Sequence, residues 1–407
     1  MENNILVKAF KACNGESILV KLKGKKNTNI LIDTGYISTY EEIKKELIKI
    51  KKDREKLDLL ILTHIDNDHI NGARKILKDY LEDEVCEIDE IWYNDYFKIF
   101  SLLSKDDEGN FINLNSELLN KLCKNEYPCD PYKIGEEEVG FKEANIISDY
   151  LLNEKVKEKL NKSFGGNAII RGSTPIKYIN EEVKITIIGP REEILLELIK
   201  EWNDYLNENG YVGTVKKNPI LTKAFELFYI NNIDFIETEY GNRECSSEFD
   251  INKLIQYEEH DDKLINRSSI SLIIEFDNKK MLFLGDSSPK DYDDIIDDIR
   301  IQEKCDKLVF DLIKVSHHGS KKNTSRKFIE NTIGKKYLIC TNGSMHMHPD
   351  LETIIKIIGL QEENKKLIFN YYLDHVDIFI KYNRLNEKYS FETNLDEITE
   401  NMVEFEV

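Results

Sequence analysis

The chain has 407 residues, of which 41% are apolar, so it can bury one large hydrophobic core or two ordinary ones. Its 76 acidic residues outnumber the 57 basic ones, and the formal charge of -19 disfavours tight non-specific binding of long duplex DNA. No apolar run approaches the roughly 20 residues that cross a bilayer, and the first residues do not resemble a signal peptide. We therefore expect a cytoplasmic protein with no membrane segment.

Alternating apolar residues predict an antiparallel meander at the start of the chain, with strands over residues 5–11, 17–22 and 29–33. An amphipathic helix is predicted over residues 40–52, and a short buried strand follows over 57–62. Small residues then open a second helix, over 72–80. The expected order is three strands, a helix, a strand and a helix.

Four side chains with metal-binding atoms directly follow the strand predicted over 57–62. They are His64, Asp66, Asp68 and His69. In an extended segment the first three would share one face, whereas Asp68 and His69 diverge only if the chain turns between them. Such a layout can serve two neighbouring metal ions, and its imidazoles and carboxylates suit zinc or manganese. The alternative is a polar turn whose charges are solvated.

The pattern His-x-Asp-x-Asp-His resembles the first metal motif of the metallo-β-lactamase superfamily, whose usual form is His-x-His-x-Asp-His. Asp66 replaces the second histidine, and this variant resembles the soluble hydrolase domain of ComEC-type DNA-uptake proteins. The superfamily also carries Asp-x-Gly after an early strand, which implies that Asp33 lies behind the metals and orients a ligand. Gly15 lies where these relatives carry a glycine; the alternative is an ordinary hairpin residue. The resemblance implies an α/β fold, a four-layer αβ/βα sandwich.

Two stretches of the chain exceed what a minimal hydrolase of this superfamily needs. They cover residues about 95–180 and 191–263, and a clear strand is predicted between them over 183–188. We interpret both as helical insertions, and the first could cover the active site and select the substrate. In the second insertion, we interpret Trp202 as a core residue rather than a platform for base stacking.

A hairpin predicted over residues 269–284 delivers Asp286 at the end of its second strand. By resemblance, Asp286 is the carboxylate that bridges the two metals; the alternative is a cap for the helix that begins at Pro289. Just upstream, the wider superfamily supplies a further metal-binding histidine. Residues 266–269 contain none, which leaves the first metal one ligand short.

A strand predicted over residues 307–315 runs into His317-His318-Gly-Ser, which resembles the second motif of the ComEC-like subgroup. The resemblance implies that His317 binds the second metal, while His318 acts as an acid or orients the substrate. His348-Pro349 resembles a later Gly-His-Pro element, so His348 completes the metal site or serves as a general acid. Four basic residues after the histidine pair either bind phosphate or form a solvated helix face; they are Lys321, Lys322, Arg326 and Lys327.

The remaining elements complete one predicted domain over residues 1–390. Residues 351–358 predict a helix, and 369–381 predict a strand that contains His375 as a structural residue. Residues 391–407 predict an acidic tail that packs at a sheet edge or frays.

Two divalent metal ions are therefore expected, with zinc as the first choice and manganese as the alternative. We predict His64, Asp66 and Asp286 on the first ion, and Asp68, His69, Asp286 and His317 on the second. The predicted catalytic residues are Asp68, His318 and His348. Two metals about 3.5 to 4 Å apart lower the pKa of a water between them toward 7 and clamp a phosphoryl oxygen.

These residues predict a metal-dependent hydrolase, specifically a phosphodiesterase or nuclease that uses hydroxide activated by the two metals. Its substrate would be a phosphorylated small molecule or the end of a nucleic acid. One alternative is a hydrolase of carboxylic esters, thioesters or lactones, because the same fold supports several chemistries. Another is a component of a prokaryotic defence or regulatory assembly, in which the insertions bind a protein partner and hydrolysis is conditional.

Overall fold

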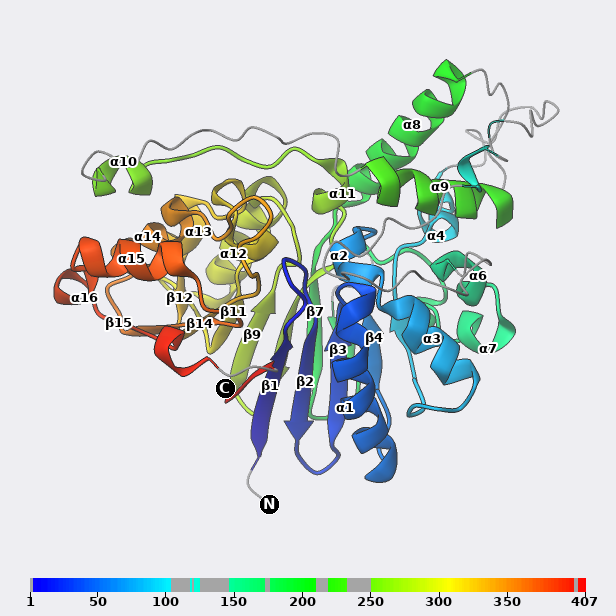
Figure 1. Ribbon diagram of the computed structural model, residues 1–407, viewed down its shortest axis with the longest axis horizontal. Helices are drawn as coiled ribbons and strands as arrows, with labels where there is room; N and C mark the ends of the chain where they lie inside the picture. Colours follow the sequence, from blue (N-terminus) through cyan, green and yellow to red (C-terminus); the bar gives the residue numbers. More distant parts are fainter. Residues whose placement is uncertain are drawn as a thin grey trace.

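The computed structural model describes residues 3–103, 118, 121–124, 146–172, 176–209, 219–232, 250–398 and 402–407. Parts of both predicted insertions therefore lie outside the described residues. Two large β-sheets pack face to face, and helices cover their outer faces (Figure 1). The four-layer αβ/βα sandwich with helical insertions is thus confirmed.

The first sheet has six strands in the order β16-β1-β2-β3-β4-β5. Their bounds are Asn4–Phe10 (β1), Ile18–Lys23 (β2), Thr28–Ile32 (β3), Leu59–Ile61 (β4), Ile91–Trp92 (β5) and Met402–Glu406 (β16). The predicted meander forms β1 to β3, and β3 to β5 run parallel. The helices that cover this sheet are α1 (Tyr40–Lys52) and α3 (Ala73–Leu81). Strand β16 pairs with β1, so the end of the chain packs at the sheet edge.

The second sheet has eight strands in the order β15-β14-β13-β11-β9-β8-β7-β6. Their bounds are Ile176–Tyr178 (β6), Lys184–Gly189 (β7), Ser271–Phe276 (β8), Lys279–Phe283 (β9), Leu312–Lys314 (β11), Lys336–Ile339 (β13), Lys365–Phe369 (β14) and Phe391–Thr393 (β15). Strands β8 and β9 form the predicted hairpin. Both residues of its turn, Asp277 and Asn278, have positive φ, as type I′ turns require.

The strand predicted over 307–315 is divided in two. Its first part, β10 (Leu308–Phe310), pairs with β12 (Thr332–Gly334) in a separate small sheet, and its second part is β11. The division falls at Asp311, whose carboxylate accepts a hydrogen bond from the Lys280 backbone N–H at 3.0 Å. The Asp311 backbone N–H in turn donates to the Lys280 carbonyl oxygen at 2.8 Å, so Asp311 is held to Lys280 where the chain passes from one sheet to the other.

The second sheet is covered by α12 (Pro289–Glu303), α13 (Arg326–Asn331), α14 (Leu351–Leu360), α15 (Asp374–Tyr382) and α16 (Leu385–Lys388). The strand predicted over 369–381 is wrong, because β14 ends at Phe369 and α15 follows. Val376, Phe379 and Ile380 are buried at helical spacing, so the helix period decides this segment. His375 is structural as predicted, since its Nε2 atom lies 3.0 Å from the carbonyl oxygen of Pro349.

Three separate clusters of buried apolar side chains fill the three spaces between the four layers. One lies between the sheets and joins residues such as Val7 and Leu272. The second packs the first sheet against α1, α3 and the insertion helices. The third packs the second sheet against α12 to α15. Each sheet is therefore buried on both faces, which explains its isoleucine- and leucine-rich strands.

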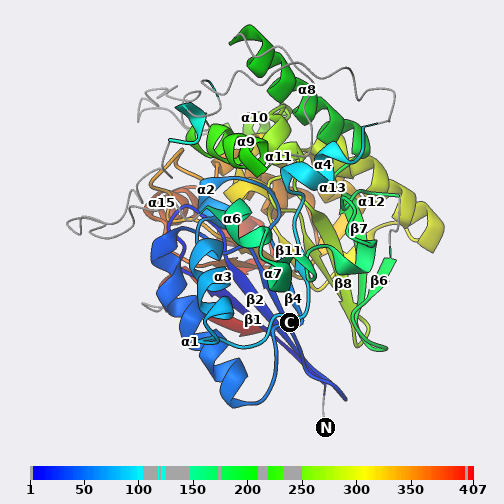
Figure 2. The same ribbon diagram turned by 90° about the vertical axis from the view of Figure 1, so that its right-hand side faces the viewer.

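Helices α4 (Tyr96–Phe100), α8 (Glu192–Glu208), α9 (Pro219–Asn232) and α10 (Ile251–Ile255) of the insertions lie toward the end of the sandwich opposite the N-terminus, followed by α11 (Leu264–Arg267) (Figures 1 and 2). Helices α6 (Ile147–Leu151) and α7 (Glu154–Lys157) of the first insertion lie at the side, near α3. Trp202 of α8 is fully buried against Phe225 and Phe228 of α9, so it is a core residue as predicted. Residues 256–263, here called the strap, connect α10 to α11.

A buried ion pair between Glu16 and Lys314 joins the two sheets. Glu16 precedes β2 of the first sheet, and Lys314 ends β11 of the second; their side chains are 1% and 0% exposed. The Lys314 ammonium contacts the Glu16 carboxylate and also donates a hydrogen bond to the Val315 carbonyl oxygen at 2.9 Å. A buried charge that loses its partner is strongly destabilising.

We therefore expect Lys314→Met to lower the free energy of unfolding by about 3 to 5 kcal/mol, because Glu16 is left buried without its partner. The double variant Lys314→Met/Glu16→Gln should recover most of this loss. Urea unfolding measures both values. Lys280→Met is the control, because its partly exposed pair with Glu303 is worth about 1 kcal/mol or less. Equal losses from Lys280→Met and Lys314→Met would contradict the assignment.

Candidate metal centre

The four metal-motif residues lie in the loop after β4 and in the short helix α2 (Asn67–Ile70). The backbone is extended at Asp66, with φ -69 and ψ 142, and becomes helical from Asn67 onward. The chain therefore turns at Asn67, and Asp68 and His69 diverge because they occupy successive positions of this helix. His69 stays beside His64, with ring centroids 4.3 Å apart, and Asp68 lies with His69 and His318 in a second group of close ligand atoms.

Asp286 occupies the middle of the centre. It follows β9 and is 2% exposed. Its Oδ2 atom lies near the Nε2 atoms of four imidazoles, at 3.8 Å from His64, 3.4 Å from His69, 3.6 Å from His317 and 3.9 Å from His318. Side chains from the ends of β4, β9 and β11 thus converge on one carboxylate.

Two groups of side chains offer ligand atoms that lie within 4.8 Å of one another. The first is His64, His69 and Asp286, and the second is Asp68, His69 and His318. Within the described part of the chain, several of their atoms are buried without a hydrogen-bond partner, including Nε2 of His64, His69 and His318 and Oδ1 of Asp286. Each such atom costs about 1 to 3 kcal/mol when unpaired. A divalent cation would satisfy them together, and the mixture of nitrogen and oxygen atoms fits zinc.

Contacts behind the centre fix which nitrogen each imidazole presents. His69 Nδ1 donates to Asp33 Oδ2 at 2.8 Å, which is the contact predicted for Asp33. His318 Nδ1 lies 2.7 Å from the Cys340 carbonyl oxygen, which can only accept. His64 Nδ1 lies 3.0 Å from the Thr63 hydroxyl, which itself donates to Asp33. Nδ1 therefore carries the proton in His69 and His318, whereas His64 Nδ1 also lies 3.2 Å from the Ser269 hydroxyl; Nε2 of all three rings faces the centre.

Asp68 is held by residues near the start of the chain. Asn14 Nδ2 donates to Asp68 Oδ2 at 3.1 Å, and the Tyr36 hydroxyl donates to Asn14 Oδ1 at 3.1 Å. A Cβ atom on Gly15 would lie 2.1 Å from the Asp68 carbonyl oxygen. Gly15 is therefore required by this close approach, which is more than a hairpin residue needs. Sequence reasoning missed Asn14, although its position beside Gly15 was a usable signal.

The structure places the remaining predicted residues around these two groups. Asp66 Oδ2 lies 3.5 Å from His64 Nε2. His318, rather than His317, groups with Asp68 and His69. His348 lies farther out, with its ring centroid 5.5 Å from that of His317 and its Nδ1 atom 3.3 Å from Asp350 Oδ2.

Sequence reasoning also missed Asp261, whose Oδ2 atom lies 3.4 Å from His317 Nδ1. Asp261 belongs to the strap, so no spacing within the motifs could have predicted it.

Charges in the centre oppose the effect of burial. Burial alone would lower the pKa of His69, but the carboxylates of Asp286, Asp68 and Asp33 hold that pKa well above its usual value. Burial alone would raise the pKa of Asp68, but His69 and His318 lower it to about 2. For His348, burial is the main cause and lowers the pKa to about 4. The carboxylates thus favour positive charge at the centre, whether protons or a cation provide it.

The basic residues after the histidine pair are mostly matched by carboxylates. Lys321 lies 3.7 Å from Glu352, Arg326 lies 2.6 Å from Glu330, and Lys327 lies 3.7 Å from Asp297. These pairs favour the solvated helix face over a dedicated phosphate site.

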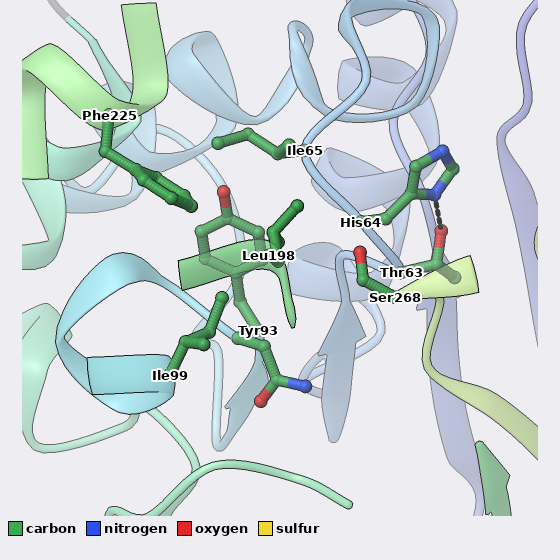
Figure 3. Close-up of a pocket in the computed structure, with 9 residues that line it drawn as sticks. Thr63, His64, Ile65, Tyr93, Ile99, Leu198, Phe225 and Ser268 are labelled. Carbon is green, nitrogen blue, oxygen red and sulfur yellow. Dashed lines mark hydrogen bonds between the residues drawn. The ribbon is translucent and has the colours of Figure 1, made fainter. Parts of the chain in front are cut away.

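A small pocket lies beside His64, between the metal loop and the insertions (Figure 3). Its apolar wall combines Ile99 of α4, Leu198 of α8 and Phe225 of α9. The hydroxyl of Tyr93 points between Phe225 and Ile65 in this view. Both insertions thus contribute to a surface that contacts a residue of the metal centre. The lining is completed by Thr63, Asn94 and Ser268.

Comparison with known families agrees with this geometry. Residues 11–88 match the metallo-beta-lactamase superfamily. The matched segment contains Asp33 and the residues from His64 to His69, and it supports assignment to this superfamily. No curated protein matches the chain. The superfamily match and the two candidate metal groups together support a metal-dependent hydrolase.

The described residues include no helix that is both long and apolar enough to cross a membrane.

We expect the purified protein to retain two divalent ions per chain, and Asp286→Asn to weaken metal affinity by at least about 10- to 100-fold. Elemental mass spectrometry after dialysis gives the stoichiometry. Thermal unfolding gives a second readout, because an ion at 100 times its Kd stabilises the folded state by about 2.7 kcal/mol. Asp277→Asn, in the exposed turn of the same hairpin, is the matched control. If Asp286→Asn bound metal as Asp277→Asn does, Asp286 would not be a ligand.

Proposed function

We propose that the chain is a dinuclear metal-dependent phosphodiesterase. The observation that carries the proposal is the position of Asp286 Oδ2, within 3.4 to 3.9 Å of four imidazole Nε2 atoms. These separations suit metal ligands gathered around one carboxylate, and three of the four imidazoles are proposed as ligands. When bound, two zinc ions, or manganese as the alternative, would polarise a phosphoryl oxygen and make hydroxide available near pH 7.

The proposed ligands of the first ion are His64, Asp66 and Asp286. Those of the second ion are Asp68, His69, His318 and Asp286. His318 replaces His317 in this assignment, because His318 Nε2 lies 3.4 Å from Asp68 Oδ2.

Two further side chains are placed to act on the substrate. Asp68, fixed by Asn14, has an 18% exposed side chain and so faces the open side of the centre. His348 is 13% exposed, and its lowered pKa keeps it neutral near pH 7. We propose that His348 orients the leaving group through a hydrogen bond, since a neutral imidazole of this kind gives up a proton poorly.

A phosphoester is favoured over a carbon ester because three aspartates share the centre with the imidazoles. A carboxylate-rich set suits two cations that clamp the charged oxygens of a phosphoryl group. Esters, thioesters and lactones remain the alternative substrates, and parallel assays separate the two classes.

We expect the metal-loaded protein to hydrolyse bis(p-nitrophenyl) phosphate, and chelation to abolish the reaction. Asp68→Ala should lower kcat/KM by about 100-fold or more, because it removes a proposed metal ligand, the carboxylate that Asn14 holds in place. Release of p-nitrophenolate measures the rate, and Asp277→Asn again serves as control. Unchanged turnover in Asp68→Ala would contradict the assignment, whereas hydrolysis of p-nitrophenyl acetate alone would favour the ester alternative.

The pocket beside His64 predicts substrate selection by the second insertion. Phe225→Ala should widen this pocket and favour a bulky diester over a small one, such as methyl p-nitrophenyl phosphate. We expect the ratio of the two kcat/KM values to change by about 10-fold. Phe228→Ala is the control, since Phe228 packs on Trp202 and Tyr205 of the same helix pair and does not line the pocket. If both variants changed the ratio of kcat/KM values equally, looser packing of α9 would explain the change, and the pocket would not select the substrate.

A further inference from the structure

Asp261 connects the second insertion to the metal centre. It is 6% exposed, and its Oδ2 atom accepts a hydrogen bond from Asn266 Nδ2 at 2.6 Å. Its backbone N–H donates to the Lys322 carbonyl oxygen at 3.2 Å, and its Oδ1 atom accepts from the Lys263 backbone N–H at 3.0 Å. The carboxylate is therefore held rigidly, with His317 Nδ1 at 3.4 Å from Oδ2.

The second neighbour of His317 Nδ1 is Asn323, whose Oδ1 atom lies at 3.1 Å. The amide orientation of Asn323 is fixed, because its Nδ2 group donates to the carbonyl oxygen of Asp286 at 3.1 Å and to that of Ser287 at 3.3 Å. Nδ1 of His317 thus faces two acceptors, the Asp261 carboxylate and the Asn323 amide oxygen, and must carry a proton. Consequently, the ring turns Nε2 toward Asp286 Oδ2, at 3.6 Å.

The backbone is unusual at this point, with φ of 46° at His317 and 54° at His318, a conformation that non-glycine residues rarely adopt and that surrounding contacts must maintain. The His317 side chain is 21% exposed, the most open of the four imidazoles around Asp286, and it lies outside both groups of close ligand atoms in the described chain. His317 is therefore placed to meet a substrate that approaches Asp286.

We propose that Asp261 is a positioning residue, which holds the His317 imidazole with Nε2 facing the substrate side of the metal centre. The proposal rests on the phosphodiesterase function and adds to it that Nε2 of His317 contacts the substrate beside the metals. The second insertion then contributes a side chain that orients His317, in addition to covering the centre. The strap is also held through Glu258, which accepts a hydrogen bond from the Arg326 backbone N–H at 2.8 Å and lies 3.6 Å from Lys356 Nζ.

A double-mutant cycle tests whether Asp261 acts through His317. Asp261→Asn should lower kcat/KM by about 10- to 100-fold in the wild-type background. The same substitution should cost less than about 3-fold more in His317→Ala, because its target is already absent. Asp262→Asn is the matched control, since this neighbouring carboxylate is 71% exposed and pairs with Lys290 at the surface. Additive losses, or an equal loss in Asp262→Asn, would overturn the proposal.

Nitrogen-15 NMR of labelled histidines gives a readout that does not depend on activity. The wild type should show a protonated, hydrogen-bonded Nδ1 atom on His317, identified by its absence in His317→Ala, and Asp261→Asn should change this signal. An unchanged signal would overturn the proposal even if activity fell. Should Asp261→Asn not fold, Asp261→Ser serves in both experiments. If the wild type hydrolyses no phosphodiester, the proposed function fails, and the NMR result still decides whether Asp261 positions His317.

Discussion

The buried Asp286 carboxylate imposes the main constraint on this molecule. A carboxylate that is 2% exposed is stable only when positive charge or hydrogen-bond donors surround it. Here four imidazoles from two distant motifs converge on it, and several of their nitrogens have no other partner in the described chain. The arrangement favours positive charge beside Asp286, and bound cations or protonated imidazoles can supply it.

The sandwich provides the rigidity that such a centre needs. Each motif begins where a buried strand ends, after β4, β9 and β11, so the apolar layers fix the starting points of all three loops. Contacts beneath the centre then fix the side chains, through Asp33 behind His69 and Asn14 beside Asp68. The Glu16–Lys314 pair ties the two sheets together at the same level. Packing, buried charge and ligand geometry therefore depend on one another.

The sequence predicted those parts of the centre that are encoded locally. His64 to His69 and Asp286 lie at strand ends, where a short apolar run and its polar successors are visible in one window. By contrast, Asp261 reaches His317 from an insertion, and no local pattern could reveal that contact. The choice between His317 and His318 also depends on backbone geometry, since both rings follow the same strand. The wrong strand at 369–381 arose because a short apolar run can fit either period, and burial of Val376, Phe379 and Ile380 decided for the helix.

Anomalous X-ray diffraction from crystals grown with zinc or manganese would test the account most directly. The account predicts two peaks about 3.5 to 4 Å apart on either side of Asp286 Oδ2, one beside His64 and the other beside Asp68 and His318. A single peak, or ions bound away from Asp286, would contradict the central role of this carboxylate.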